Sequence, residues 1–306
     1  MQSRNWNSAK DQIVDASGAP LTACANPTDR PERLFHFTDS AGLVGILQSR
    51  SLRAFLATSL NDPSEIAHGM QCSREVLARG VGSISREFLD TTSRLLDPAN
   101  VRQAYRLEWR AYVISFCASV DNVLHWLHYG RSGTGVAIGF DATAVRRAPF
   151  DLFKVVYDRA EQDRLVASVI QGTAGALEHC LVDLEAAEGD ALKEGAAHIA
   201  AGRLWALASL MKNPVFAAEG EWRLVTHDLR GERIPNEHMV PLRMDYRATS
   251  GRVVPFQELV FDHLTATEIV LGWSAAMEPN DQGLDELMHN TCGTLTVRRS
   301  TVPVRP

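Results

Sequence analysis

Two carboxylates separated by a single glycine, Glu219 and Glu221, precede a strand-like apolar run. Because alternate residues of a strand share a face, both side chains are expected to project together, which would raise the pKa of one of them toward a proton-transferring value. A fixed carboxylate also stabilises the positive charge that develops on a ribose carbon when a glycosidic bond breaks. The pair is therefore a candidate catalytic site for chemistry on a nucleotide, with Glu221 as its essential carboxylate.

Polar groups of a complementary kind occur early in the chain. His36 and Thr38 are two residues apart in the strand-like run 33–38, so their side chains are expected on one face. An imidazole can donate a hydrogen bond to ribose or phosphate oxygens, and an aromatic ring such as Trp126 or Tyr129 can stack on a planar base. These residues are the candidate nucleotide-binding groups.

Structural roles compete with each of these assignments. A Glu-x-Glu pair at the start of a strand is common on solvated edges, and a lone histidine is more often a hydrogen-bonded core residue than a catalyst. Arg223 is expected to point away from the face of Glu221, where a salt bridge elsewhere competes with phosphate binding. Arg252 is either a pyrophosphate ligand or a solvated charge at a strand end.

The run that contains Asn61, Asp62 and Glu65 is first of all a good helix start. An Asn or Asp side chain caps the free N–H groups, and Glu65 complements the positive end of the helix dipole. The functional alternative is that these three residues line the mouth of the cleft and bind the acceptor. The pair His125 and His128 lacks a third strong ligand, so no metal site is expected.

Composition narrows the class of protein. The chain has 306 residues, of which 45% are hydrophobic and 22% charged, so it can bury a sizeable core. Its formal charge of −6 argues against a broad surface for duplex nucleic acid. The start lacks the apolar run of a secretory signal, which predicts a cytoplasmic protein that does not enter a membrane. Five widely spaced cysteines, an odd number, are expected to be reduced bystanders.

Apolar periodicity predicts an α+β fold with a mixed, mostly antiparallel sheet and a helical insertion. Residues 1–30 are expected to form a partly ordered N-terminal arm, and residues 31–306 a single α+β domain. The helical region at about 160–211 is expected to be two helices broken near Gly189 or Gly195. Predicted strands lie at 33–38, 52–56, 112–118, 135–140, 152–157, 222–227, 240–246, 252–259, 268–271 and 294–297, and further helices at 40–47, 61–78, 84–96, 100–110, 121–128 and 282–289.

The order of several short motifs resembles the bacterial family called domain of unknown function 2971. The resemblance extends over about Arg33 to Arg305, and it implies domain boundaries rather than an activity. The motifs are Leu34-Phe35-His36-Phe37-Thr38, Asn61-Asp62-Pro63-Ser64-Glu65, Ser115-Phe116-Cys117 with Trp126 and Tyr129, Gly135-Val136-Ala137-Ile138-Gly139-Phe140-Asp141, Glu219-Gly220-Glu221-Trp222-Arg223, Val254-Pro255-Phe256 and Ser300-Thr301-Val302-Pro303-Val304-Arg305.

A second resemblance, confined to short motifs, is to NAD-dependent ADP-ribosyltransferases. It implies an ADP-ribosyltransferase-like sheet, NAD as cofactor, His36 on the nicotinamide-side ribose and Glu221 at the transition state, with Glu219 as accessory acid. The middle motif departs from that family, which usually offers Ser-Thr-Ser or a stacking tyrosine where this chain has Ser115-Phe116-Cys117. This hypothesis requires His36 and Glu221 to face one cavity.

The leading functional hypothesis is thus an ADP-ribosyltransferase-like enzyme that acts on a protein or nucleic-acid acceptor, a chemistry that would suit toxin or defence work. One alternative is a non-catalytic ligand-binding or interaction domain. The other is a metal-dependent phosphoesterase or nuclease that uses Asp62, Glu65, Glu219 and Glu221. Oligomeric state is not encoded in any of these motifs.

Overall fold

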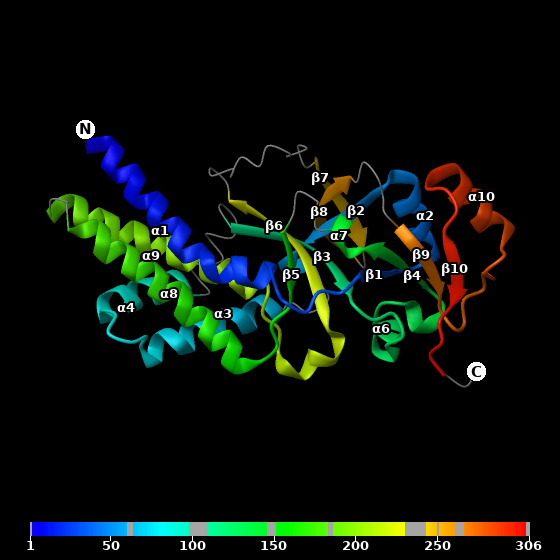
Figure 1. The fold of residues 1–306 in the computed structure, drawn as a ribbon, viewed down its shortest axis with the longest axis horizontal. Coiled ribbons are helices and arrows are strands. Elements are labelled where there is room, and N and C mark those ends of the chain that lie inside the picture. Colours follow the sequence, from blue (N-terminus) through cyan, green and yellow to red (C-terminus); the bar gives the residue numbers. More distant parts are fainter. Residues whose placement is uncertain are drawn as a thin grey trace.

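A mixed, mostly antiparallel sheet lies toward one end of the molecule and a helical lobe extends from it toward the other, which makes an α+β fold (Figure 1). The computed structural model describes residues 2–59, 64–97, 109–145, 151–182, 186–229, 243–249, 251–260 and 266–303. The predicted α+β class with a mostly antiparallel sheet is confirmed. Within those residues, no helix combines the length and the apolar character that crossing a membrane requires.

The sheet contains ten strands in the described part of the chain, in the order β10-β9-β4-β1-β3-β2-β8-β7, with β6 on β3 and β5 on β6. All neighbouring pairs are antiparallel except β9 and β10. The strands are β1 (Arg33–Thr38), β2 (Ser51–Leu56), β3 (Trp109–Cys117), β4 (Val136–Asp141), β5 (Asp151–Lys154), β6 (Glu221–Leu229), β7 (Arg243–Thr249), β8 (Arg252–Val260), β9 (Ala266–Leu271) and β10 (Thr296–Arg299).

Strand β3 is the branch point of the sheet. One of its edges pairs with β6 along its whole length, from Trp109 to Cys117. The other edge is shared, because β1 pairs with it at Cys117 and β2 pairs with it at Tyr112 and Val113. The strands that carry His36, Ser115 and Glu221 are therefore immediate neighbours, in the order β1-β3-β6.

The two faces of the sheet pack against different helices. One face holds Phe116 and Trp222 in a core that also includes residues of α2 (Ser40–Ser49) and α10 (Gln282–Thr291). On the opposite face, the helical lobe covers Val113 and Val225, and a smaller cluster with Trp126 covers Cys117. The remaining helical segments are α1 (Gln2–Ala25), η1 (Ala57–Ser59), α3 (Ser64–Arg79), α4 (Arg86–Leu95), α6 (Val123–His128), η2 (Arg131–Gly133), α7 (Ala142–Val145), α8 (Arg159–Leu181), α9 (Ala186–Ala208) and η3 (Pro214–Glu219).

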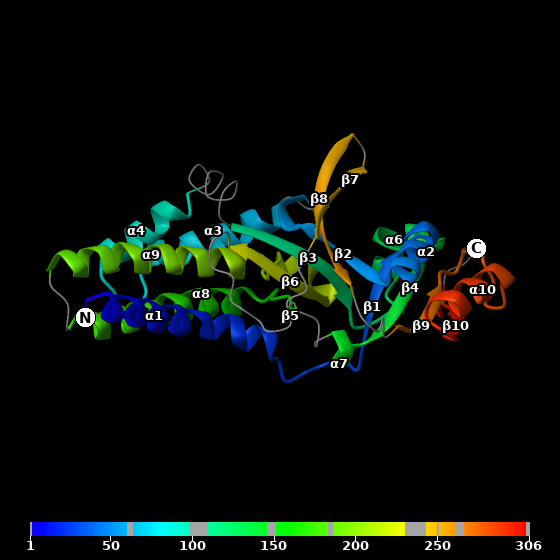
Figure 2. The ribbon, with the colours of Figure 1, turned by 90° about the horizontal axis from the view of Figure 1, so that it is seen from above.

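Residues 2–25 differ from the expected partly ordered arm, because they form the helix α1. This helix runs beside α8 and α9 in both ribbon views (Figures 1 and 2). Ile13 is completely buried in the core of the helical lobe. Pro20 lies inside the helix, so the proline that favoured an irregular arm did not end the helix.

The long helical region is two helices, as predicted, but the break lies elsewhere. Helix α8 ends at Leu181 and α9 begins at Ala186, so that Gly189 and Gly195 are inside α9. Packing overrides the modest cost of glycine in a helix interior, because α9 is the central helix of the lobe, with Leu204 and Trp205 fully buried. Most of the helix expected at 100–110 lies outside the described residues, and its last two residues belong to β3.

Candidate functional site

Glu221 is the first residue of β6, and its carboxylate is held by a neighbour on its own strand. Arg223 donates from Nε to Glu221 Oε1 and from Nη2 to Oε2, both at 2.8 Å, and from Nη1 to the carbonyl of Ser209 at 2.7 Å. Arg223 is 1% exposed and Glu221 7%. The expectation that Arg223 points away was wrong, because residues two apart on a strand share a face.

Lys212 completes a group of four charges. Its ammonium donates to Glu221 Oε2 at 3.2 Å and forms an ion pair with Glu219, and it lies 5.3 Å from the centre of the Phe216 ring. We call Lys212, Glu219, Glu221 and Arg223 the buried ion-pair cluster. Two positive and two negative side chains make its formal charge zero. Buried charges are tolerated when they are paired in this way and hydrogen-bonded.

The two carboxylates meet for a different reason from the one expected. Glu219 ends η3 rather than lying on a strand, and Gly220 between them has a φ of 51°, a left-handed conformation that glycine adopts readily. Burial acts to raise the pKa of Glu221, but the charge and hydrogen bonds of Arg223, together with Lys212 and Ser115, lower it to about 2. The predicted rise toward a proton-transferring pKa is therefore contradicted for Glu221, which stays ionised at neutral pH.

Of the two aromatic residues predicted to bind the cofactor, Tyr129 lies beside the cluster. Its hydroxyl donates to Glu219 Oε1 at 3.2 Å and its side chain is 39% exposed. Trp126 is completely buried, and its indole Nε1 donates to the carbonyl of Val120 at 2.8 Å. The Trp126 ring also packs edge-on against Phe37 at 4.8 Å, so Trp126 is a core residue rather than an open platform for a base.

His36 lies on the opposite face of the sheet from Glu221. Phe35 pairs with Cys117 and Cys117 pairs with Glu221, so these three side chains share a face. His36, one residue along, instead contacts Phe116 at 5.8 Å between ring centres, within the core on the other face. The shared cavity that the ADP-ribosyltransferase hypothesis requires is thus not formed by these two side chains.

The described contacts of His36 are those of a structural residue. Its Nδ1 is 3.0 Å from the carbonyl oxygen of Ser115, and because a carbonyl only accepts, Nδ1 carries the hydrogen. Burial lowers the pKa of His36, against the opposing effect of that hydrogen bond, so the ring is neutral at neutral pH. This hydrogen bond joins β1 to β3 at Ser115, between the part of β3 that pairs with β1 and the part that pairs with β2. Thr38, at the end of β1, adjoins the start of α2.

The remaining predicted site residues are not placed beside the cluster. Arg252 is exposed at the turn of the β7–β8 hairpin, which projects from the sheet (Figure 2). Strands β2 and β3 separate that hairpin from β6. Asn61 and Asp62 lie outside the described residues, as does the side chain of Glu65, whose backbone is in the first turn of α3. The catalytic, cofactor-binding and acceptor-binding roles stay predictions.

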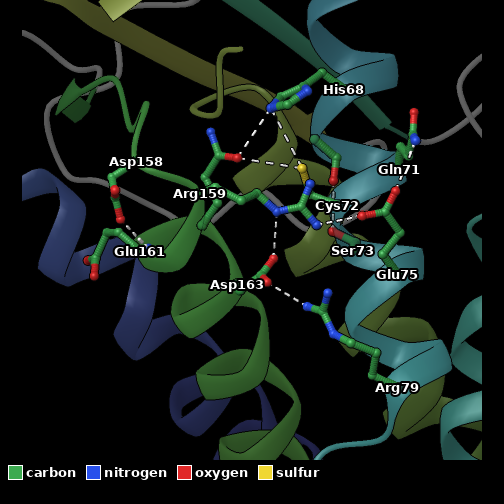
Figure 3. Close-up of polar contacts among 12 residues, drawn as sticks. His68, Gln71, Cys72, Ser73, Glu75, Arg79, Asp158, Arg159, Glu161 and Asp163 are labelled. Atoms are coloured by element: carbon green, nitrogen blue, oxygen red, sulfur yellow. Dashed lines mark hydrogen bonds and ion pairs between the residues drawn. The ribbon is translucent and has the colours of Figure 1, made fainter. Parts of the chain in front are cut away.

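A polar cluster that sequence reasoning missed joins α3 to α8 (Figure 3). Gln162 is completely buried; its Oε1 lies 3.2 Å from His68 Nε2 and 3.5 Å from Cys72 Sγ. Its Nε2 donates to the carbonyls of Val156 at 2.8 Å and Lys212 at 2.9 Å. Gln162 therefore fixes the backbone of the lysine that neutralises the acidic pair. The i, i+4 spacing of His68 and Cys72 was a usable signal, but their partner is distant in sequence.

The chemistry of this second cluster is structural rather than nucleophilic. Cys72 is fully buried, and burial raises the pKa of its thiol, which disfavours the reactive thiolate. Around it, Arg159 pairs with Glu75 at 2.6 Å and with Asp163 at 2.9 Å, and Arg79 pairs with Asp163 at 2.5 Å. No group of three or more potential metal ligands gathers within the described ranges.

Comparison with known proteins gives one match. Residues 125–224 match the model of a family described as a protein of unknown function (DUF2971). The match supports the resemblance found in the sequence, over a narrower range that runs from α6 to β6 and contains the whole buried ion-pair cluster. No curated protein and no solved structure matches the chain.

NAD does not fit these residues as they are arranged. His36 and Glu221 face opposite sides of the sheet, and both oxygens of Glu221 are already hydrogen-bonded by cationic side chains. A cavity lined by Leu152 and Trp222 has a volume of about 10 Å³, enough for a single water molecule. It lies on the Trp222 face of β6, not on the Glu221 face.

Proposed function

We propose that this chain is a non-catalytic ligand-binding domain whose site is the junction of α6, η3 and β6. The observation that carries the proposal is the state of Glu221, a buried carboxylate paired with Arg223 and Lys212. A group with a pKa of about 2 does not exchange protons at neutral pH. In a cluster of zero net charge it also presents little net field to a developing cation. The ion pairs therefore serve to hold the junction together.

The ligand-binding part of the proposal rests on two aromatic side chains at the edge of the cluster. Tyr129 is 39% exposed and Phe216 is 37% exposed. Tyr129 contacts Glu219, and Phe216 lies under the ammonium of Lys212. Exposed rings next to convergent polar groups are typical of ligand sites.

A second candidate, ADP-ribosyl transfer from NAD, is favoured by one observation. The three strands that carry its motif-like residues, β1, β3 and β6, are neighbours in the sheet. That function would require the ion-pair cluster to open and His36 to act from the other face. The metal-dependent alternative has no such support among the described residues, since no ligand cluster is formed there.

One experiment separates the two functions. Purified protein is incubated with NAD, alone and with cell lysate, and nicotinamide release and transfer of labelled ADP-ribose are followed. The ligand-binding proposal predicts background signals for wild type and for Glu221→Gln alike. Turnover by wild type that is lost in Glu221→Gln would overturn it. Glu221→Gln disturbs the partners of a buried carboxylate, so its folded fraction is measured by circular dichroism. Tyr129→Phe, which keeps the ring and removes only the hydroxyl that binds Glu219, is assayed as a second variant.

A further inference from the structure

Strand β7 ends the sheet, and within the residues that the structure describes no strand pairs with its outer edge. Strand β2 pairs with β8 only between Phe256 and Val260. The outer part of the β7–β8 hairpin, beyond the pair of Tyr246 and Pro255, is therefore a ribbon of two strands that projects from the sheet (Figure 2). A two-stranded ribbon is only marginally stable in water, and an unpaired edge is a template for a further strand. The edge of β7 is a candidate interaction surface.

One face of this ribbon is apolar and exposed. Tyr246 lies opposite Pro255, and Ala248 lies opposite Val253. Residues that are opposite one another, or two apart on a strand, share a face, so these four side chains lie together. Tyr246 is 65% exposed and Val253 72%. Exposed apolar patches of this kind mark surfaces that bind another molecule.

The backbone of Tyr246 faces the outer edge of β7. Its N–H donates to Asp245 Oδ1 at 2.8 Å, and the residue opposite it in β8 is Pro255, which has no N–H. The backbone groups of successive residues in a strand point to alternate sides. The N–H and C=O groups of Met244, Tyr246 and Ala248 are thus directed outward, where they can form a ladder with another strand.

We propose that this strand is β7 of a second copy of the chain, paired antiparallel about a two-fold axis at Tyr246, so that one sheet runs through a dimer. In this register Asp245 lies opposite Arg247 of the second copy, and Arg247 lies opposite its Asp245. A two-fold interface is self-complementary, so each contact is made twice. The inference goes beyond the proposed ligand-binding function and does not depend on it.

The charges of β7 select this partner and this register. Asp245 and Arg247 are exposed on the face opposite to Tyr246. Within the described part of the chain neither forms an ion pair, although the charge of Arg247 also acts on Asp39. Opposite charges directly across two strands are stabilising and like charges are destabilising. A slip of two residues in either direction would place Asp245 opposite Asp245, or Arg247 opposite Arg247.

The test is the mass of the purified full chain in solution, measured by light scattering during size-exclusion chromatography over a wide range of protein concentration. One chain has a mass of 33.7 kDa, and we expect wild type to reach twice that mass as the concentration rises. Asp245→Arg and Arg247→Asp each place like charges opposite one another twice. Each variant alone should therefore raise the dissociation constant of the dimer about tenfold or more.

The matched control is Arg252→Asp, which makes the same change of charge as Arg247→Asp on the inner strand of the same hairpin, where Arg252 is also exposed. It should dimerise as wild type does. Circular dichroism verifies that each variant is folded, which is expected because all three side chains are exposed.

Combining the two reversals tests the register itself. The double variant Asp245→Arg, Arg247→Asp restores both charge pairs and should dimerise again. An equal mixture of the two single variants should form a mixed dimer at concentrations where neither dimerises alone. In the wild-type dimer, the amides of Met244, Tyr246 and Ala248 should exchange with deuterium more slowly than in the monomer, which association through another surface would not cause.

A wild type that stays monomeric at every concentration would overturn the inference and leave the edge of β7 to a strand of a different protein. A dimer that both reversals leave intact would overturn it too, as would losses that neither the double variant nor the mixture repairs. None of these results depends on nicotinamide release, so the failure of this inference and the failure of the proposed function are distinguished.

Discussion

Two ion-pair clusters in this molecule use the same residue types in different surroundings. The buried ion-pair cluster lies under η3 on the sheet, with side chains of Lys212 and Arg223 that are 4% and 2% exposed. The cluster around Arg159 joins α3 to α8 (Figure 3). It is open to solvent, because the side chain of Arg159 is 38% exposed and that of Glu75 is 42% exposed. Water screens the second set and not the first, so we expect the two sets to contribute very differently to stability. Counting ion pairs would treat them alike.

The largest effect is expected from breaking the buried cluster at Arg223. In Arg223→Met, the carboxylate of Glu221 loses its two-point partner and Lys212 must neutralise two acids alone. Removing one partner of a buried pair costs about 3–5 kcal/mol, measured as the loss of free energy of unfolding in urea. A loss below about 1 kcal/mol is the range of surface ion pairs. It would show that the buried ion-pair cluster is hydrated and that it does not differ in stability from the cluster around Arg159.

Acid should weaken the buried cluster in a defined pH window. The pKa of Glu221 is lowered from 4.5 to about 2 in the folded protein. Its contribution to stability is therefore complete above pH 4.5 and is lost as the pH falls from about 4.5 toward about 2. The shift corresponds to about 3 kcal/mol at neutral pH. Urea unfolding of wild type and Glu221→Gln is measured at pH 7 and pH 3, and the free energy of unfolding should change less with pH in the variant. An equal change in the two proteins would contradict the lowered pKa of Glu221.

The link between the two clusters is Gln162, and its removal should have an intermediate effect. In Gln162→Leu, the carbonyls of Val156 and Lys212 lose a buried donor, a change that costs about 1–3 kcal/mol. The matched control is Gln71→Leu, because the amide of Gln71 binds Glu75 on the exposed side of α3. Equal losses for the two variants in thermal or urea unfolding would mean that Gln162 does not bridge the clusters.

His36 should matter for the sheet and not for NAD chemistry. His36→Phe keeps a ring against Phe116 but removes the hydrogen bond to the Ser115 carbonyl. A single hydrogen bond contributes about 1 kcal/mol, so the free energy of unfolding should fall by about that amount. Ligand binding at α6 and η3 should stay as in wild type. Loss of binding without loss of stability would place His36 in the site after all.

The exposed cluster should show the smallest effect. Arg159→Ala removes two ion pairs, yet the free energy of unfolding should change by about 0–1 kcal/mol because solvent replaces both contacts. The residual effect should shrink further in 0.5 M salt, where surface charges are screened. A loss comparable with that of Arg223→Met would be incompatible with the proposed difference between the clusters.

Much of the sheet could be predicted from the sequence because strand signals are local. The alternating run at 33–38 and the apolar run bounded by Gly135 and Asp141 became β1 and β4 with nearly the predicted limits. The helix α1 was missed, since few of its residues are strongly apolar and, among its described side chains (residues 7–25), Ile13 is the only large one that is fully buried. Its stability comes from packing on α8 and α9, which no local pattern reports.

The arrangement of the candidate site could be predicted in part, whereas the roles of its residues stay predictions. The acidic pair and Tyr129 do meet, but Lys212 comes from the turn after α9 and was not considered, because its contact with Glu219 depends on how α9 packs on the sheet. The contact between Arg223 and Glu221 could have been predicted, because residues i and i+2 on a strand share a face. His36 was misplaced for a similar reason, since one residue of register along β1 decides which face a side chain occupies.

The most direct test of this account is the titration of the Glu221 carboxylate by ¹³C NMR, with the signal assigned by comparison with Glu221→Gln. A structural ion pair predicts a midpoint at about 2, with no change in the signal between pH 5 and pH 8. A midpoint at or above 4.5, the value of an ordinary glutamate, would contradict it and return Glu221 to the proton-transferring role.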